Sequence, residues 1–239
     1  MHKPKSDAMI ERILIVAAHP DDADFGLGGT VAKWTDAGIA VTLLCVTRGE
    51  QGARPGADIS GIPALREQEQ RAASAEVGIT DVRFLDGYRD GWLEPTFELQ
   101  RDIVAVIRDV RPQRLVCQSP ERIYTRMQAS HPDHLAAGEA SLRAAYPAAE
   151  NPIAWPELGL PFHHVGEIWL MAHPKPDHAI DITDTFDRKL AALRRHVSQT
   201  GHRGEELDEF LRRVSGRMAE SFGLPEGRLA EVFAIVPLN

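Results

Sequence analysis

The sequence predicts a doubly wound α/β fold, in which a mostly parallel β-sheet carries helices on both faces. Short apolar runs alternate with segments of helical periodicity along the chain, and this alternation is typical of that fold class. The chain has 239 residues, which fits one large domain, because domains run to roughly 250 residues. We see no internal repeat, so we predict a single domain over residues 1–239.

The first structural unit lies near the start of the chain. An apolar run at 12–18 predicts a strand, and a helical pattern follows it after a polar turn and ends at Gly38. Residues 40–46 form a second continuous apolar run, of the kind found where a parallel strand is buried on both faces. Two strands joined by a helix predict a right-handed βαβ unit.

The alternation continues through the middle of the chain, where Pro112 ends a helix just before another strand. The predicted elements are a helix at 64–77, a strand at 82–85, a helix at 98–110 and a strand at 114–118. Four alternations favour a Rossmann-like sheet. We expect the common doubly wound strand order 3-2-1-4-5, which places strands one and four side by side.

The last part of the chain is less regular. We predict a helix from Asp133 to Ala145, strands at 165–171, 179–182 and 229–236, and helices near 184–198 and 205–221. The Pro-rich stretch at 147–163 predicts an irregular surface excursion. We expect this excursion to form part of the wall of the substrate pocket.

Composition excludes several classes of protein. With Lys+Arg 27 against Asp+Glu 35, the net charge of −8 argues against nucleic acid as a partner. No apolar run approaches the roughly 18–20 residues that span a bilayer, so we expect no membrane insertion. The start of the chain lacks the apolar stretch of a signal peptide, which predicts a cytoplasmic protein. Cys45 and Cys117 lie inside apolar runs and are expected to be core thiols.

Two polar clusters carry the chemical information. The sequence HPDD at 19–22 follows the first strand directly, and HPDH at 131–134 follows the fourth. In the expected strand order these two strands meet at the topological switch point, where ligands bind beyond the carboxyl ends of the strands. We therefore expect the two clusters to converge on one site.

The clusters contain the residues that a catalytic zinc needs. Such a site has three protein ligands, imidazole or carboxylate, with the fourth position left to water. We assign His19, Asp22 and His134 as the ligands. The remaining carboxylate of the first turn, Asp21, faces the water and is assigned as the general base.

The second cluster divides in a similar way. His131 is expected to offer a proton or a positive charge to the oxyanion and to the leaving amine, and Asp133 to hydrogen-bond one imidazole. A structural alternative is that Asp133 is simply the N-cap of a helix. The glycines at 26, 28 and 29 do not have the G-x-G-x-x-G spacing of a dinucleotide loop, so they more simply permit close backbone packing.

The residues also resemble a known family. Segments 13–34 and 131–138 are similar to the LmbE-like, or PIG-L, zinc N-deacetylases, and the resemblance extends to 84–91 and 181–199. That family acts on N-acetylglucosaminyl lipids, on mycothiol and bacillithiol precursors and on chitobiose. The resemblance covers most of the chain. It implies a small amino-sugar or glycoside substrate, Zn²⁺ or another divalent metal such as Fe²⁺, and a homo-oligomer, either a trimer or a hexamer.

Further site residues follow from the resemblance alone. It implies that Arg66 and Asp90 contact the sugar hydroxyls, and that His196 also contacts the substrate, reaching the site from the C-terminal region or from a neighbouring subunit. One departure from the family pattern is that Ala23, and not Glu, follows HPDD. Asp24, one position later, is a candidate for the missing carboxylate.

These inferences predict a zinc-dependent hydrolase that removes an N-acetyl or other N-acyl group from an N-acetylglucosamine-type substrate. One alternative is an amidase that cleaves a larger thiol conjugate or a peptide-like amide. Another is a metal-containing binding protein without turnover, although a purely structural zinc would not need Asp21 and His131. A nucleotide-binding regulatory domain would want a phosphate-cradling loop, and none is found at the expected place.

Overall fold

The structure, a computed structural model, describes residues 3–52, 59–125, 127 and 130–238. Its centre is a seven-stranded sheet of order β3-β2-β1-β4-β5-β7-β6. The strands are β1 (Arg12–Ala17), β2 (Ala40–Cys45), β3 (Asp81–Phe84), β4 (Arg114–Gln118), β5 (Glu167–Met171), β6 (His178–Asp181) and β7 (Ala230–Pro237). Strands β1 to β5 run parallel, whereas β7 is antiparallel to both β5 and β6. The predicted order 3-2-1-4-5 is therefore confirmed, and two C-terminal strands extend it.

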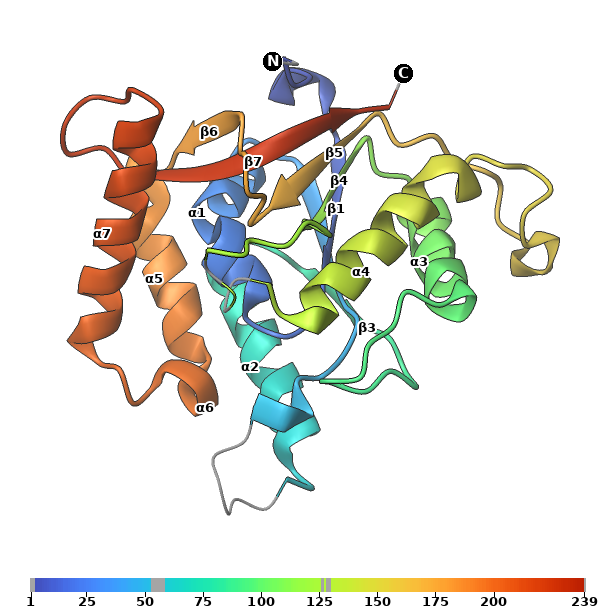
Figure 1. The fold of residues 1–239 in the computed structure, drawn as a ribbon, viewed down its shortest axis with the longest axis horizontal. Helices are drawn as coiled ribbons and strands as arrows, with labels where there is room; N and C mark the ends of the chain where they lie inside the picture. Colours follow the sequence, from blue (N-terminus) through green and yellow to red (C-terminus); the bar gives the residue numbers. More distant parts are fainter. Residues whose placement is uncertain (1–2, 53–58, 126, 128–129, 239) are drawn as a thin grey trace.

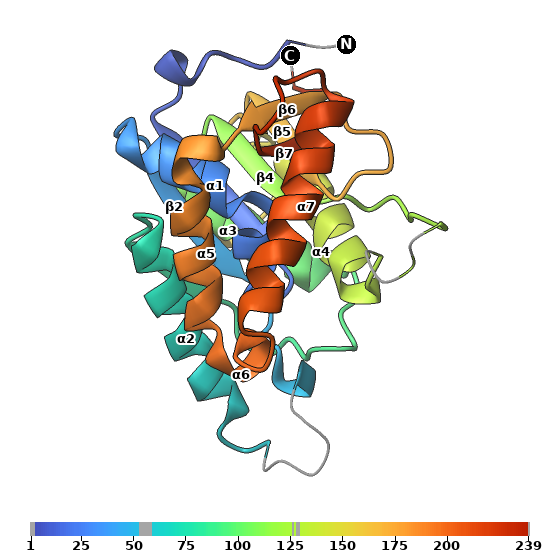
Figure 2. The same ribbon diagram turned by 90° about the vertical axis from the view of Figure 1, so that its left-hand side faces the viewer.

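Helices cover both faces of this sheet. Helices α1, α2 and α5 lie on one face and α3 and α4 on the other (Figure 1), while α7 lies beside α5 and packs on β6 and β7 (Figure 2). The helices are α1 (Asp22–Asp36), α2 (Ile62–Glu76), α3 (Phe97–Val110), α4 (Pro132–Arg143), α5 (Phe186–Arg195), α6 (Val197–Thr200) and α7 (Glu205–Ser221). Short 3-10 turns lie at Asp7–Met9, Glu50–Gly52, Pro156–Leu158 and Thr183–Thr185, and a π-helical turn at Ala144–Ala148. Within the described ranges no helix has the length and apolar character to cross a bilayer.

Strand β1 shows why its apolar run is continuous. Its side chains alternate between two cores, with Ile13 and Ile15 facing the α1 side and Leu14 and Val16 facing the α3 and α4 side. All four are fully buried. Because successive side chains of a strand point to opposite faces, a strand covered on both sides must be apolar at every position.

The predicted helix near 184–198 is interrupted. Helix α5 ends at Arg195, and the backbone of His196 (φ −80°, ψ 59°) leaves the helical region before α6 starts at Val197. The interruption turns the imidazole of His196 inward, where Asp24 of α1 accepts its hydrogen bond. A helical pattern in the sequence could not reveal this break, because its cause lies in a distant segment.

The expectation that the Pro-rich excursion at 147–163 lines the substrate pocket is wrong. The cavities that border the two polar clusters are lined by other segments. Helix α4 begins at the carboxyl edge of the sheet and runs back, so the excursion that links it to β5 lies at the opposite edge. There the Arg108 guanidinium donates hydrogen bonds to the carbonyls of Ala148, Ala149, Asn151 and Ala154.

Candidate metal centre

The turn between β1 and α1 aims several polar side chains beyond the end of the strand. Asp21 has a left-handed backbone (φ 86°), which is uncommon for a residue with a Cβ, and Asp22 begins α1. The Asp22 carboxylate accepts a hydrogen bond from the backbone N–H of His19 at 2.8 Å. This bond closes the turn, so that His19, Asp21 and Asp22 all project from one small region.

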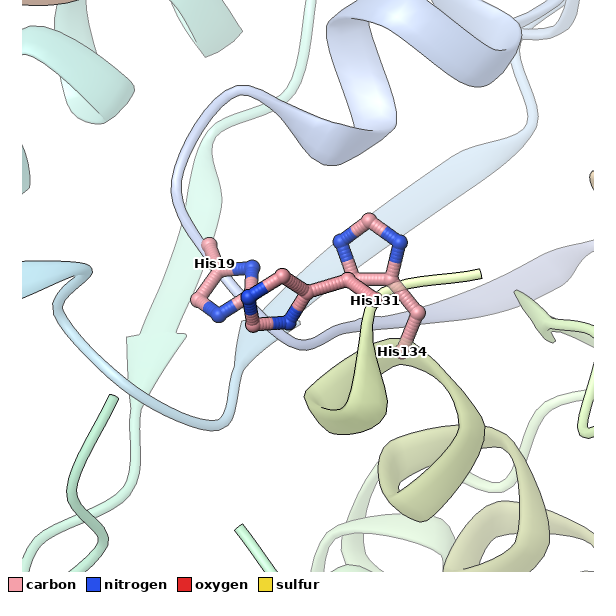
Figure 3. A group of neighbouring side chains, drawn as sticks. All are labelled: His19, His131 and His134. Carbon is pink, nitrogen blue, oxygen red and sulfur yellow. The ribbon is translucent and has the colours of Figure 1, made fainter. Parts of the chain in front are cut away.

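The second segment is the start of α4. His131 is the N-cap, and its Nδ1 accepts a hydrogen bond from the backbone N–H of Asp133 at 3.2 Å. Figure 3 shows the rings of His19, His131 and His134 gathered where the loop after β1 faces the first turn of α4. Their centroids lie 5.0, 5.2 and 5.4 Å apart. The predicted convergence of the two clusters is confirmed.

Asp22 lies between two of these histidines. Its Oδ1 is 3.0 Å from Nε2 of His134, and its Oδ2 is 3.5 Å from Nδ1 of His19. Gln118, the last residue of β4, donates a further hydrogen bond to Asp22 at 2.8 Å. Burial opposes ionisation of Asp22, but the facing imidazoles outweigh it and hold the pKa of this carboxyl well below its usual range.

The other edge of the His19 ring meets two more carboxylates. Its Nε2 is 3.0 Å from Asp90 and 3.1 Å from Asp133, both of which are buried. Burial lowers the pKa of His19, but the hydrogen bonds to Asp133, Asp22 and Asp90 outweigh it and raise the pKa to about 12. A histidine that binds a metal through one nitrogen normally donates its other N–H to a carboxylate, as this ring can.

The donor set fits a divalent cation. Nitrogen atoms of His19, His131 and His134 lie within 4.8 Å of one another, and so do donor atoms of His19, Asp90 and Asp133. Two buried carboxylates, Asp90 and Asp133, and the partly buried Asp22 lie around His19, and a divalent cation would compensate their negative charge. In the second group, Asp133 and Asp90 already accept backbone N–H bonds, which favours a supporting role for them over ligation.

Asp21 is held beside a buried arginine. Its Oδ2 is 3.0 Å from Nη2 of Arg66, and its backbone N–H donates to Oε1 of Gln70 at 2.7 Å. Burial and the neighbouring charge of Asp22 raise the pKa of Asp21 to about 6, against the opposing effect of Arg66. A carboxyl that titrates near neutrality is suited to accept and return a proton.

His131 is the most open of the three histidines. Because its Nδ1 accepts the Asp133 N–H, the neutral ring carries its proton on Nε2. Burial and the neighbouring His19 lower its pKa, which favours the neutral ring. The remaining N–H is thus available as a hydrogen-bond donor at the cavity.

Asp133 hydrogen-bonds one imidazole, as predicted, but the alternative assignment for it is wrong. It is not the N-cap of α4, since His131 occupies that position. Its carboxylate accepts backbone N–H bonds from Gly91 at 2.7 Å and Leu93 at 3.3 Å, and it bonds to His19. The imidazole that it fixes is therefore His19, whereas His131 lies 4.0 Å from its nearer oxygen.

The structure places Arg66 and Asp90 at the site, where both already hydrogen-bond to other parts of the protein. Arg66 donates to the carbonyls of Gly49 and Pro20 as well as to Asp21, and it is only 4% exposed. Asp90 bonds to His19 and to the backbone N–H of Gln51. Both line the cavity described below, so their contact with sugar hydroxyls stays a prediction.

His196 lies behind the site, within the same chain. It is fully buried, and its Nε2 is 2.8 Å from Oδ2 of Asp24. Asp24 also accepts a hydrogen bond from Gln70 at 2.9 Å. The carboxylate of Asp24 therefore connects His196, through Gln70, to the backbone of Asp21. The direct substrate contact of His196 stays a prediction.

Sequence reasoning missed two glutamines that organise the site. Gln118 holds Asp22, and its polar side chain at the end of an apolar strand was a usable signal, because that position faces the ligand edge. Gln70 holds Asp21 and Asp24, and it follows Arg66 by one helical turn on the same face of α2. Neither signal is specific without the tertiary structure.

Two cavities border the metal centre, and Asp22 and His134 line both of them. We call the smaller one, of about 330 Å³, the polar cavity. It is lined by His19, Asp21, Asp22, Gln51, Gly52, Arg66, Asp90, His131 and His134. The larger one, of about 490 Å³, lies on the other side of Asp22 and His134, towards β7 and α7.

Comparison with known proteins places this geometry in a family. The family model described as PIG-L, GlcNAc-PI de-N-acetylase, matches residues 14–145, more than half of the chain. The diacetylchitobiose deacetylase of Thermococcus kodakarensis is 35% identical over 99% of this chain and 86% of that protein. A probable N-acetyl-alpha-D-glucosaminyl L-malate deacetylase 2 of Bacillus cereus is 35% identical over 80% of this chain and 85% of that protein.

Solved structures agree with the sequence comparison. The N,N'-diacetylchitobiose deacetylase of Pyrococcus horikoshii matches with a TM-score of 0.86 at 29% identity, over 96% of this chain and 85% of that chain. GalB, the 4-carboxy-2-hydroxymuconate hydratase of Pseudomonas putida, matches with a TM-score of 0.74 at 22% identity and shares the fold. The His and Asp clusters, the sheet order and these similarities together show that the chain belongs to the PIG-L family of GlcNAc-PI de-N-acetylases.

Proposed function

We propose that this protein is a metal-dependent hydrolase that removes the N-acyl group from an N-acetylglucosamine-type small molecule. The observation that carries the proposal is the polar cavity, in which Asp21, His131 and the candidate metal donors face one space. Relatives that act on chitobiose and on glucosaminyl malate support this substrate class. Because the same fold also occurs in a hydratase, the assignment rests on the site and not on the fold.

The proposed metal ligands are His19, Asp22 and His134. Asp22 supports this choice because its two oxygens face nitrogens of the other two residues, at 3.5 and 3.0 Å. Two imidazoles and a carboxylate are a common ligand set for catalytic zinc and also suit Fe²⁺. When bound, Zn²⁺ supplies the Lewis acidity that makes water nucleophilic at neutral pH.

We assign the proton transfers to Asp21. Its carboxylate lines the polar cavity, and it takes the proton of the water that attacks the amide carbonyl carbon. Arg66 and Gln70 fix the carboxylate and the backbone of Asp21, so that the base does not swing away from the cavity. A carbon–oxygen bond forms, the carbon–nitrogen bond breaks, and Asp21 returns the proton to the departing amine. The products are a carboxylate and a free amino sugar.

His131 acts on the carbonyl oxygen. Its Nε2–H donates a hydrogen bond to the negative charge that develops on that oxygen, and the N-cap bond to Asp133 holds the ring in this tautomer. A metal-binding protein without turnover would have no use for such a donor beside a fixed base. An amidase for larger conjugates would use the same groups, and the substrates offered in the test below separate these functions.

The test measures amine release from N-acetylglucosamine, its malate and inositol glycosides and N,N'-diacetylchitobiose. Metal-stripped protein is assayed with and without added Zn²⁺ or Fe²⁺, beside Asp21→Asn and a matched surface variant, Asp184→Asn. We expect metal-dependent release that falls by about 10²- to 10⁴-fold in Asp21→Asn, while the surface variant keeps its activity. Release from none of the four substrates by metal-loaded protein would contradict the proposal. The same samples test by light scattering the predicted trimer or hexamer.

A further inference from the structure

The larger cavity has an apolar lining that the proposed chemistry does not use. Its volume of about 490 Å³ lies within the range of small-molecule pockets, roughly 300–1,000 Å³. Six apolar side chains that line it are only partly buried by the rest of the protein. They are Phe25, Ile123, Val214, Met218, Phe222 and Val232. Apolar surface concentrated in a concave site indicates an apolar ligand.

The charged side chains deeper in the wall do not change this character. Lys189 donates to Glu231 and to the carbonyl of Phe25 at 2.7 Å, and Glu231 also accepts the backbone N–H groups of Gly29 and Thr30. Lys189 and Glu231 are each about 2% exposed. Because these charges are paired and buried, they neutralise each other and offer the cavity little to bind a polar ligand.

The position of this cavity relates it to the scissile bond. Asp22 and His134 line both this cavity and the polar cavity, so an amide that reacts at these residues would lie at the boundary of the two. An amide has two substituents, the amine and the acyl chain, which leave the reacting carbon in different directions. The hydroxyl groups of a sugar suit the polar cavity, which leaves the apolar cavity for the acyl chain.

We propose that the apolar cavity binds the hydrocarbon chain of a medium-chain N-acyl group, so that the preferred substrate is an N-acyl glucosamine with more carbons than N-acetyl. This inference rests on the proposed function and names its substrate class. An acetyl methyl group occupies about the space of one water molecule, roughly 30 Å³. It would leave nearly all of the cavity wall in contact with water.

The experiment compares N-acetyl-, N-butanoyl-, N-hexanoyl- and N-octanoyl-glucosamine with the metal-loaded enzyme. Each buried methylene contributes about fourfold to binding in the transition state. We therefore expect kcat/KM to rise from acetyl to hexanoyl by roughly 200-fold in total. Equal or falling values with longer chains, while the acetyl substrate is still hydrolysed, would overturn the inference and leave the proposed function intact.

Two tryptophan variants locate the effect. Val214→Trp, on α7, fills the cavity, so the ratio of kcat/KM for hexanoyl to that for acetyl should fall at least about tenfold. Ile153→Trp introduces the same side chain at a position that is 81% exposed and outside the cavity lining, and it should keep the wild-type ratio. A general loss of folding would lower both rates together. An unchanged ratio in Val214→Trp would also overturn the inference.

A binding measurement separates failure of the cavity from failure of the proposed function. Sodium octanoate should raise the melting temperature of the wild type and of Ile153→Trp, and should not raise that of Val214→Trp. If no acyl glucosamine releases amine, the proposed function fails. The octanoate shift then decides the cavity by itself, since its presence supports an apolar-ligand site and its absence overturns one.

Discussion

The polar and apolar cavities share Asp22 and His134 but are built from different parts of the chain. Every residue that lines the polar cavity lies between His19 and His134, in the loops after the parallel strands and near the start of α1, α2 and α4. The apolar cavity takes most of its wall from residues 171–232, chiefly α7, β7 and the loop after β5. The matched family model, at residues 14–145, covers the first set and ends before most of the second.

The two cavities therefore differ in what they offer a ligand. The polar side places charged groups at hydrogen-bonding distances, and each of its carboxylates has a hydrogen-bond partner that fixes it. The apolar side presents shape and hydrophobic area, which discriminate between ligands by size and not by charge. On our proposal, the same candidate metal centre would serve different acyl groups when the C-terminal wall differs.

The largest expected effect concerns the identity of the metal ligands. Asp22→Ala should reduce bound zinc to background and abolish activity, whereas His131→Ala should keep the metal and lower kcat by about 10²- to 10³-fold. The measurements are metal content by elemental analysis and amine release. The nitrogen atoms of all three histidines are close enough for ligation. If His131→Ala lost its zinc and Asp22→Ala kept it, the proposed ligand set would be wrong.

The next effect concerns the support behind the polar cavity. Asp24→Ala leaves the fully buried imidazole of His196 without its partner, so it should lower the free energy of unfolding by about 3 kcal/mol. Asp184→Ala, whose side chain is 94% exposed, should change it by less than about 0.5 kcal/mol. Urea denaturation followed by circular dichroism measures both. Equal stability of the two variants would show that the Asp24–His196 pair does not stabilise the fold.

The smallest expected effects concern two glycine substitutions, one in α4 and one in α7, on either side of the candidate metal centre. In α4, a Cβ at Gly138 would lie 2.3 Å from the carbonyl oxygen of Gln118, so Gly138→Ala must push α4 away from β4 and cost about 2 kcal/mol. In α7, a Cβ at Gly216 meets only Leu229, at 4.0 Å, so Gly216→Ala should stabilise by about 0.5–1 kcal/mol.

Thermal denaturation and amine release measure the two glycine variants together. Gly138→Ala should also lose activity, because Gln118 holds Asp22 and α4 carries His134. Gly216→Ala should retain activity on the acetyl substrate. A neutral effect of Gly138→Ala would mean that the contact between α4 and β4 yields without moving the metal centre.

Much of the fold was predictable because the burial of a strand or helix shows in the pattern of apolar residues in its own sequence. The apolar run that became β4 was predicted at 114–118 and observed at Arg114–Gln118, since every side chain of that strand is buried. The predicted helix near 184–198 was broken at His196, because a hydrogen bond to a residue 172 positions away outweighs helical periodicity there. The prediction that the excursion at 147–163 lines the pocket was wrong. The direction of the strands places this excursion at the edge of the sheet opposite the site, and strand direction is a property of the whole sheet.

By itself the sequence determined which segments become strands and helices, and that two His and Asp clusters follow strands one and four. Both follow from local patterns, because periodicity reflects which faces are buried, and parallel strands bring their ends to one edge. Only the tertiary structure decided that Asp133 hydrogen-bonds to His19 and that Arg66 donates its hydrogen bonds to Asp21 and to backbone carbonyls. It alone also decided that an apolar cavity adjoins the candidate metal centre. These features depend on distances between segments far apart in the chain, which no local pattern encodes.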